Sequence, residues 1–138
     1  MATELDYLVL QLHDAQTSLD QKKIISAELS LAEYHYNNSN FVKSKLFLNS
    51  ILKKEKFFPN VHYYLALIEI NEENHELAIK YLDKEMKINP YNENAKRLKE
   101  KLKVHTNFPY ITIFFLLINL LFFALNFPEI SLVNSIKY

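Results

Sequence analysis

Apolar residues recur three and four residues apart from the N-terminus to about Lys103, which is the spacing of an amphipathic helix. This pattern predicts helices at the following residues: 4–17, 18–36, 41–52, 59–70, 77–89 and 92–103. No stretch alternates apolar and polar residues with the period of two that marks a half-buried strand. The fold class predicted from the pattern is therefore all-α.

Residues with known preferences for helix ends fix several of these boundaries. Thr3 precedes the first apolar pattern, and Ser18 followed by Gln21 is typical of a capping box that starts the second helix. Pro59 suits the first turn of the fourth helix, and Pro90 ends the fifth. The chain contains no Gly, so we expect Asn to supply the positive φ angles of tight turns.

The apolar positions change character near the C-terminus. Residues 106–128 carry no charge, and the run at 108–127 has about the 20 residues that cross a bilayer core of roughly 30 Å. The sequence therefore predicts a transmembrane helix over 106–128 and a short tail over 129–138. A buried core helix is the alternative, but so small a domain has no room to bury a helix that is apolar on all sides.

Basic residues are distributed unequally around this segment. Five lie between 96 and 103, whereas Lys137 is the single base after it. Because basic residues favour the cytoplasmic side of a membrane, we expect an integral, single-pass protein with its N-terminal domain in the cytoplasm.

The N-terminal part repeats itself when it is shifted by 34 residues. The pairs that match are Leu31 and Leu65, Ala32 and Ala66, Asn37 and Asn71, Asn40 and Asn74, Ser44 and Ala78, Phe47 and Tyr81, and Leu48 and Leu82. Small residues recur at 32, 44, 66 and 78, where we expect the two helices of a hairpin to approach most closely.

This spacing, with Leu65-Ala66, Ala78, Leu82 and the closing Asn89-Pro90, resembles the tetratricopeptide repeat family. The resemblance covers roughly 23–102, and it departs from the family at Ser39 and Glu73, which replace the turn glycine. It implies an α-solenoid of antiparallel helical hairpins, followed here by the transmembrane helix. The implied domains are an N-terminal helix at 1–22 and about two repeats with a C-terminal capping helix at 23–104.

In that family the first helix of each repeat lines a concave groove that binds a protein or peptide. By position, the groove candidates here are Leu29, Glu33, Tyr36, Asn37, Asn60, Tyr63, Leu67, Ile70 and Asn71. The alternative is that some of these side chains pack against the N-terminal helix. The resemblance favours a membrane-anchored interaction module, or adaptor, that catalyses nothing and meets the membrane through 108–127.

A second resemblance lies in the apolar segment. Pro109, Thr112, Asn119 and Phe123 follow a spacing that is similar to the first transmembrane helix of rhomboid-family intramembrane proteases. An ordinary membrane anchor explains the same residues. If the resemblance holds, the chain is the front end of such a protease without its catalytic part, because the glycine-flanked catalytic Ser motif is absent.

Composition excludes several other functions. Without Cys the chain has no disulfide and no thiolate metal site, and without Gly it has no phosphate-binding loop. The five His residues show no i,i+4 pair, so we expect no metal site and no other cofactor. The 16 basic and 16 acidic residues cancel, which gives no electrostatic reason to expect a nucleic-acid partner.

Overall fold

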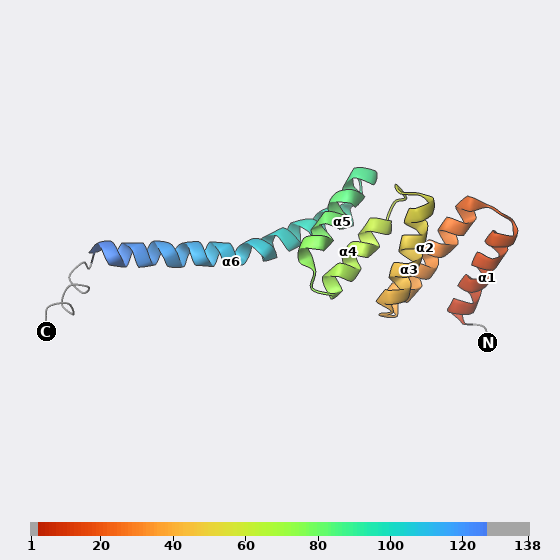
Figure 1. The fold of residues 1–138 in the computed structure, drawn as a ribbon, viewed down its shortest axis with the longest axis horizontal. Coiled ribbons are helices and arrows are strands. Elements are labelled where there is room, and N and C mark those ends of the chain that lie inside the picture. The colour runs from red at the N-terminus through yellow and green to blue at the C-terminus, as the bar shows by residue number, and fades with distance from the viewer. Residues whose placement is uncertain (1–2, 127–138) are drawn as a thin grey trace. The chain divides into compact units, whose positions relative to one another are not determined.

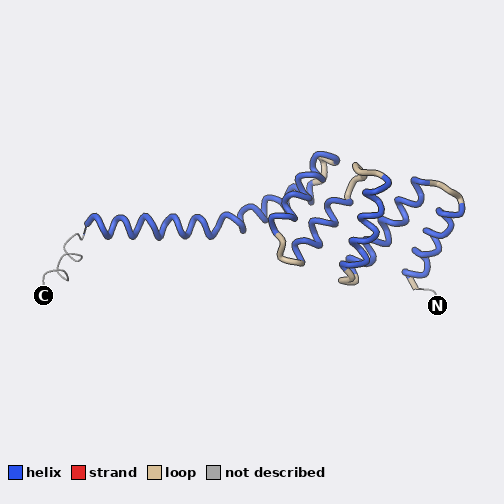
Figure 2. The backbone as a smooth tube through the Cα atoms, in the orientation of Figure 1, coloured by secondary structure: helices blue, strands red, loops and turns tan. Residues whose placement is uncertain are grey.

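The computed structural model describes residues 3–126, except for the side chains of 105–109 and 111. The helices are α1 (Glu4–Thr17), α2 (Gln21–Asn37), α3 (Phe41–Lys54), α4 (Val61–Asn71), α5 (His75–Ile88) and α6 (Glu93–Asn126) (Figure 1). Only short turns and loops join them, and residues 3–126 contain no strand (Figure 2). The prediction of an all-α fold is confirmed.

The chain divides into two units, Met1–Leu102 and Lys103–Tyr138. In the first unit, α1 packs on α2, α2 on α3, and α4 on α5, while α4 also contacts α3 and α2. The pairs α1–α2, α2–α3 and α4–α5 therefore lie side by side as hairpins (Figure 1). The N-terminal helix is α1, and residues 21 and 22 already belong to α2.

One backbone turn recurs between the hairpin helices. The second residue after the preceding helix, which we call the middle residue of the turn, donates its N–H to the carbonyl three residues earlier in the chain. The residue after it donates its N–H to the carbonyl five residues earlier. The donors and distances are Leu19 3.2 Å and Asp20 3.4 Å, Ser39 2.9 Å and Asn40 2.8 Å, and Glu73 3.0 Å and Asn74 2.8 Å. The second and third turns lie 34 residues apart, so the sequence repeat is also a repeat of backbone structure.

The middle residue of each of these turns has a left-handed backbone. The φ angles are 53° at Leu19, 57° at Ser39 and 62° at Glu73. The expectation that Asn would take such positions holds only for Asn60, at 69°, in the loop before α4. The other three residues accept a conformation that costs a residue with Cβ roughly 1–2 kcal/mol, because the hydrogen bonds of the turn hold them there.

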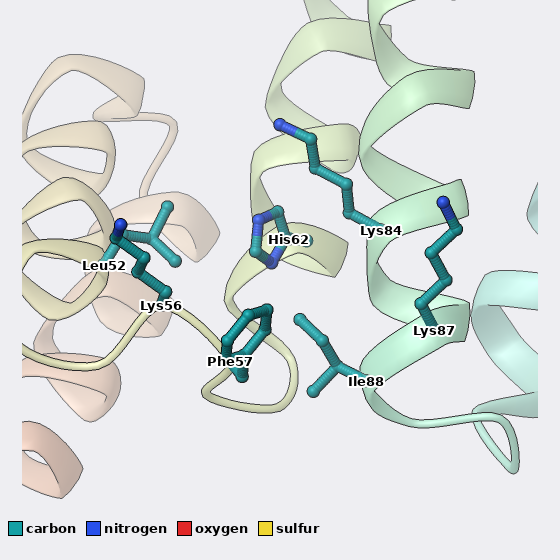
Figure 3. A pocket seen from close by; sticks show the side chains of 7 residues that line it. All are labelled: Leu52, Lys56, Phe57, His62, Lys84, Lys87 and Ile88. Carbon is teal, nitrogen blue, oxygen red and sulfur yellow. The ribbon is translucent and has the colours of Figure 1, made fainter.

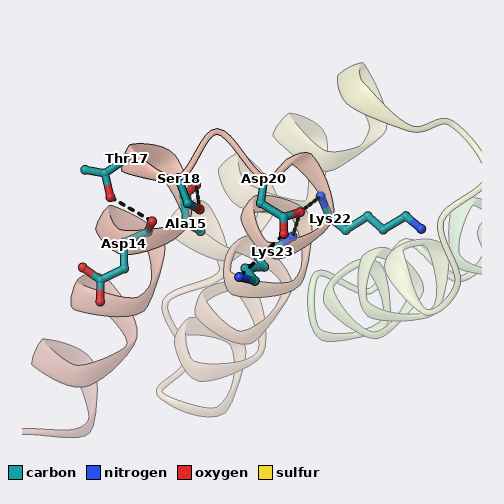
Figure 4. Close-up of polar contacts among 7 residues, drawn as sticks. All are labelled: Asp14, Ala15, Thr17, Ser18, Asp20, Lys22 and Lys23. Carbon is teal, nitrogen blue, oxygen red and sulfur yellow. Dashed lines mark hydrogen bonds and ion pairs between the residues drawn. The ribbon is translucent and has the colours of Figure 1, made fainter.

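Three predicted helix starts differ from the structure by two residues or more, those of α2, α4 and α5, and α5 begins at His75 rather than at 77. α2 is capped by Asp20, whose Oδ1 accepts the backbone N–H of Lys22 at 3.1 Å and of Lys23 at 3.2 Å (Figure 4). Ser18 instead ends α1, and its hydroxyl donates to the carbonyl of Ala15 at 2.9 Å. Pro59 lies before α4 rather than in its first turn, since the left-handed Asn60 separates the two.

The apolar core of the first unit consists of two clusters of buried residues. The first cluster joins α2, α3 and α4 through Ile25, Ala32, Leu48, Ile51, Val61, Leu65 and Ile68. The second joins α4, α5 and the start of α6 through Ala66, Ala78, Leu82, Ala95 and Leu102. The small residues predicted at the helix crossings are fully buried, and the Ser44 hydroxyl donates to the Ala32 carbonyl at 2.8 Å.

Ion pairs connect helices both between the hairpins and within one of them. The ammonium of Lys45 on α3 lies 2.9 Å from Glu69 on α4 and 2.7 Å from Glu72 at its C-terminal end. Burial alone would lower the pKa of Lys45, but the hydrogen bonds to Glu72 and Glu69 outweigh it and raise that pKa. On α2, the buried Glu28 pairs with Lys54 of α3.

The second unit begins at Lys103, and α6 continues through it to Asn126. Large apolar side chains between Ile113 and Leu125 are 45–71% exposed. Asn119 and Asn126 turn their amides back onto the helix and donate to the carbonyls of Phe115 and Phe122 at 2.8 and 2.7 Å.

Among the described residues, no helix has both the length and the apolar character required to cross a membrane. The predicted transmembrane helix over 106–128 is therefore not confirmed, and its helical part is a continuation of α6 rather than a separate helix. Residues 127 and 128 and the predicted tail at 129–138 lie outside the described residues.

Candidate functional site

The predicted groove residues lie on α2, on α4 and in the loop before α4, and tyrosine rings connect the two helices. The ring of Tyr36 on α2 lies 5.8 Å from that of Tyr64 on α4, centroid to centroid, and Tyr63 lies 5.8 Å from Tyr64. Both pairs meet edge to face, which is a favourable geometry for aromatic rings. The helices thus join their aromatic side chains into one continuous row.

Polar groups from both helices surround this row. The Glu33 carboxylate of α2 lies close enough to the Tyr64 hydroxyl to raise its pKa. The amide nitrogen of Asn71 donates to the Tyr36 hydroxyl at 3.5 Å and to the Leu67 carbonyl at 2.8 Å. We call the surface formed by Glu33, Tyr36, Tyr63, Tyr64 and Asn71 the tyrosine face.

Two tyrosines of this face, Tyr63 and Tyr64, have a raised pKa. Burial, and then the negative charge of Glu33, raises the pKa of Tyr64 far above its usual range. Burial also raises the pKa of Tyr63, with a further contribution from Tyr36. At neutral pH both hydroxyls are therefore hydrogen-bond donors as well as acceptors.

The apolar candidates have a structural role as well as a surface. Leu29 and Tyr36 pack against the first core cluster, and Tyr63 and Ile70 pack against the second. Leu67 is half-buried on α4. The buried residues of the two clusters come from α2 to α6. No buried residue of either cluster comes from the N-terminal helix α1, which was the alternative packing partner.

The two remaining candidates lie in different places. Asn37 is exposed at the C-terminal end of α2, which is the position equivalent to Asn71 on α4. Asn60 lies before the first residue of α4, and its backbone N–H donates to Glu85 Oε1 at 2.8 Å. Its side-chain oxygen accepts from Asn92 at 3.3 Å. These contacts tie Asn60 to α5 and to the loop before α6, and none of them is to the tyrosine face.

Tyr64 is a member of the face that the sequence interpretation did not select. Its spacing gave a usable signal, because Tyr64, Leu67 and Asn71 follow each other by three and four residues on α4. The family pattern pointed to Tyr63 instead, and no pairwise sequence signal reveals that Tyr64 reaches Glu33 across two helices.

The tyrosine face combines polar and aromatic groups. Hydroxyl, amide and carboxylate groups lie beside aromatic rings, and no activated nucleophile is paired with a base there. Within residues 3–126, no three His, Cys, Asp or Glu side chains come close enough together to hold a metal ion.

Comparison with protein-family models, with curated proteins and with solved structures found no match to this chain. The class that the described fold defines is an all-α protein whose first unit is built from helical hairpins.

Proposed function

We propose that this protein is a membrane-attached interaction module of the tetratricopeptide type, and that its tyrosine face binds an extended segment of a protein partner. The observation that carries the proposal is the row of Tyr36, Tyr64 and Tyr63 across α2 and α4. Tyrosine offers a large, stiff and amphipathic contact surface, which is why it is enriched where proteins bind one another.

The polar groups beside the row suit a peptide backbone. Asn37 and Asn71 are exposed at equivalent positions, and a side-chain amide both donates to and accepts from a peptide group. Glu33 adds a negative charge, so a basic residue in the peptide would be favoured over an acidic one. The 34-residue offset places these groups at a regular interval, as a repeated binding unit requires.

Membrane attachment through residues 108–127 is the second part of the proposal. It is supported by the exposed apolar side chains between Ile113 and Leu125, since such a continuous apolar surface marks an interaction site. Each large side chain removed from water contributes about 1.5–3 kcal/mol. The Lys-rich residues before the segment favour a single-pass arrangement with the hairpins in the cytoplasm.

Site-specific photo-crosslinking tests the face in cells. A photoreactive phenylalanine analogue at residue 37 or 71 should give a protein adduct, whereas the same analogue at the exposed residue 49 on α3 should give none. The double variant Tyr63→Ala, Leu67→Ala should lose the adduct while it keeps its helical circular dichroism. Adducts from residue 49 alone, or adducts that survive in the double variant, would disprove the proposed face.

The absence of Cys in the natural sequence allows a clean test of topology. Single cysteines at residues 40 and 135 should react with an impermeant thiol reagent from opposite sides of the membrane. Labelling of both from one side would contradict the single-pass arrangement without touching the proposed binding face.

The similarity to the rhomboid family stays an alternative prediction. Thr112, Asn119 and Phe123 lie on α6, whereas the side chain of Pro109 is outside the described residues. A Gly-x-Ser-Gly motif between further apolar segments, encoded downstream of Tyr138, would favour this alternative. A stop codon there would favour the adaptor.

A further inference from the structure

A pocket of about 580 Å³ lies between the end of α3, the loop before α4, and the helices α4 and α5 (Figure 3). It is lined by Leu52, Lys56, Phe57, His62, Lys84, Lys87 and Ile88, and we call it the lysine pocket. Its lining combines three apolar residues with three lysines and a histidine, and none of the seven lining residues is acidic. A few polar groups in a mainly apolar cavity of this size are typical of small-molecule sites.

The other hairpin explains why this pocket is open. In α2 and α3, the equivalent place is occupied by the buried Glu28 carboxylate, which accepts from Lys54 and from Ser50 at 2.9 Å. The offset of 34 residues converts Glu28 to His62, Ser50 to Lys84, and Lys54 to Ile88. The second hairpin has therefore lost the carboxylate and kept a cation nearby.

This exchange leaves a buried polar atom without a partner. His62 is 6% exposed, and its Nδ1 has no hydrogen-bond partner among the described residues. Its ring packs near Tyr81, and Figure 3 shows the imidazole between Phe57 and Lys84 at the pocket. A buried donor or acceptor without a partner destabilises the fold, so a bound group that pairs with Nδ1 is favoured.

The charges around His62 favour an anion. Burial, and then the positive charge of Lys84, lowers the pKa of His62, while Glu85 opposes this change. The imidazole is therefore neutral at pH 7, and Nδ1–H is available as a donor in one tautomer. Glu85 is not among the lining residues of the pocket; its Oε1 accepts from the Asn60 N–H and from Asn92, and its buried Oε2 has no partner among the described residues.

We propose that the lysine pocket binds a small amphiphilic carboxylate. The apolar body of the ligand lies on Leu52, Phe57 and Ile88. Its carboxylate lies in the pocket beside the His62 imidazole, between the Lys84 ammonium and His62 Nδ1. Lys56 and Lys87 add positive charge at the rim. This site is independent of the tyrosine face and of its partner.

The test uses the full chain in phosphatidylcholine nanodiscs and the water-soluble probe 2-naphthoate, measured by equilibrium dialysis against empty nanodiscs. The neutral analogue 2-naphthamide should bind at least tenfold more weakly. Inorganic phosphate should not displace the probe at equal concentration. Equal binding of the amide would overturn the proposal, because it would show that the charge of the carboxylate does not contribute. Displacement by phosphate would also overturn it, because it would show that the apolar body does not contribute.

Variants of exposed residues locate the site without disturbing the fold. Lys84→Gln with Lys87→Gln should weaken binding of 2-naphthoate about tenfold, and Phe57→Ala should weaken it to a similar degree. The matched control Lys22→Gln with Lys101→Gln changes the same charge elsewhere and should leave the affinity unchanged. The proposal fails if the control pair weakens binding as much as the pocket pair, or if Phe57→Ala, with native circular dichroism, binds as the natural chain does.

A second variant restores the first hairpin's chemistry in the second. His62→Glu with Lys84→Ser and Ile88→Lys rebuilds the Glu28, Ser50 and Lys54 arrangement and should abolish 2-naphthoate binding in a folded protein. Undiminished binding by this folded triple variant would show that the ligand carboxylate does not lie beside the His62 imidazole.

Discussion

The hairpins α2–α3 and α4–α5 have similar backbone structures, but they bury different side chains at several equivalent positions. Both turn through a left-handed residue, both place small residues at the helix crossing, and both bury a Leu at equivalent positions, Leu48 and Leu82. In the first hairpin, however, Glu28 and Lys54 neutralise each other. In the second, His62 and Ile88 leave a pocket open. The turn and the close contacts specify the hairpin, and neighbouring positions are free to differ.

A second difference concerns a fully buried position. Ile51 belongs to the first core cluster, whereas its equivalent, Glu85, is equally inaccessible but charged. The Glu85 carboxylate accepts from the backbone N–H of Asn60 and from the side chain of Asn92. It therefore holds the loop before α4 next to the loop before α6, a contact that an aliphatic side chain could not make.

The largest expected effect tests the part that the hairpins share. Leu48→Ala and Leu82→Ala should each lower the free energy of unfolding by about 2–5 kcal/mol, because both side chains are fully buried. Chemical denaturation followed by circular dichroism measures the loss. Leu46→Ala, at an exposed position of α3, should stay within about 0.5 kcal/mol of the natural chain. A small loss for only one of the buried leucines would break the equivalence of the hairpins.

The next largest effect tests a feature that only the first hairpin has, the Glu28–Lys54 ion pair. Lys54→Ala leaves the Glu28 carboxylate without its cation and should cost about 1–3 kcal/mol of stability. Lys53→Ala, which removes an exposed neighbouring ammonium, is the matched control and should be nearly neutral. Equal effects of the two substitutions in denaturation would mean that the Glu28–Lys54 pair does not stabilise the first hairpin.

Glycine substitutions sharpen the comparison of the turns. Ser39→Gly and Glu73→Gly should each raise the unfolding free energy by about 0.5–1 kcal/mol, since Gly adopts positive φ without the steric cost of Cβ. Lys80→Gly, in the middle of α5, should instead lower it by about 1 kcal/mol. A loss of stability at either turn would show that the side chain there contributes more than the backbone strain costs.

The smallest effect is a dependence on pH. Burial lowers the pKa values of His35 and His62, with further contributions from Lys43 and Lys84. The unfolded chain then binds more protons than the folded one as pH falls through about 6.5, so stability falls in that window. The melting temperature should be lower at pH 5.5 than at pH 7.5. The variant His35→Gln with His62→Gln should reduce this difference, whereas His13→Gln, at an exposed site, should not.

Helix positions were predictable because periodicity carries the signal for long amphipathic segments. Thr3 and Pro90 mark helix ends as predicted, but at the start of α2 the cap is Asp20 rather than Ser18. Both residue types are good caps, and only the turn geometry, which makes Ser18 the end of α1, decides between them. The left-handed Leu19 was unpredictable for the same reason: nothing in a Leu side chain indicates positive φ.

The sites show the same limit. Tyr36 and Tyr63 could be selected from their positions in the repeat, whereas Tyr64 required knowledge of the contact between α2 and α4. The lysine pocket could not be predicted from any single segment. It depends on residues from 52 to 88 that meet only in three dimensions, and on a carboxylate that the second hairpin lacks.

The recurrence of one turn at Ser39-Asn40 and Glu73-Asn74 makes the segment 41–74 an interchangeable module. It begins just after a turn and ends with the same turn, so the chain enters and leaves it with equivalent local geometry. If a second copy of 41–74 were inserted after Asn74, its first residue would follow Asn74 as Phe41 follows Asn40. Its last residue would precede His75 as Asn74 does now. The length of the tyrosine face could thus grow in whole modules, each with its own tyrosines, without a change at any junction.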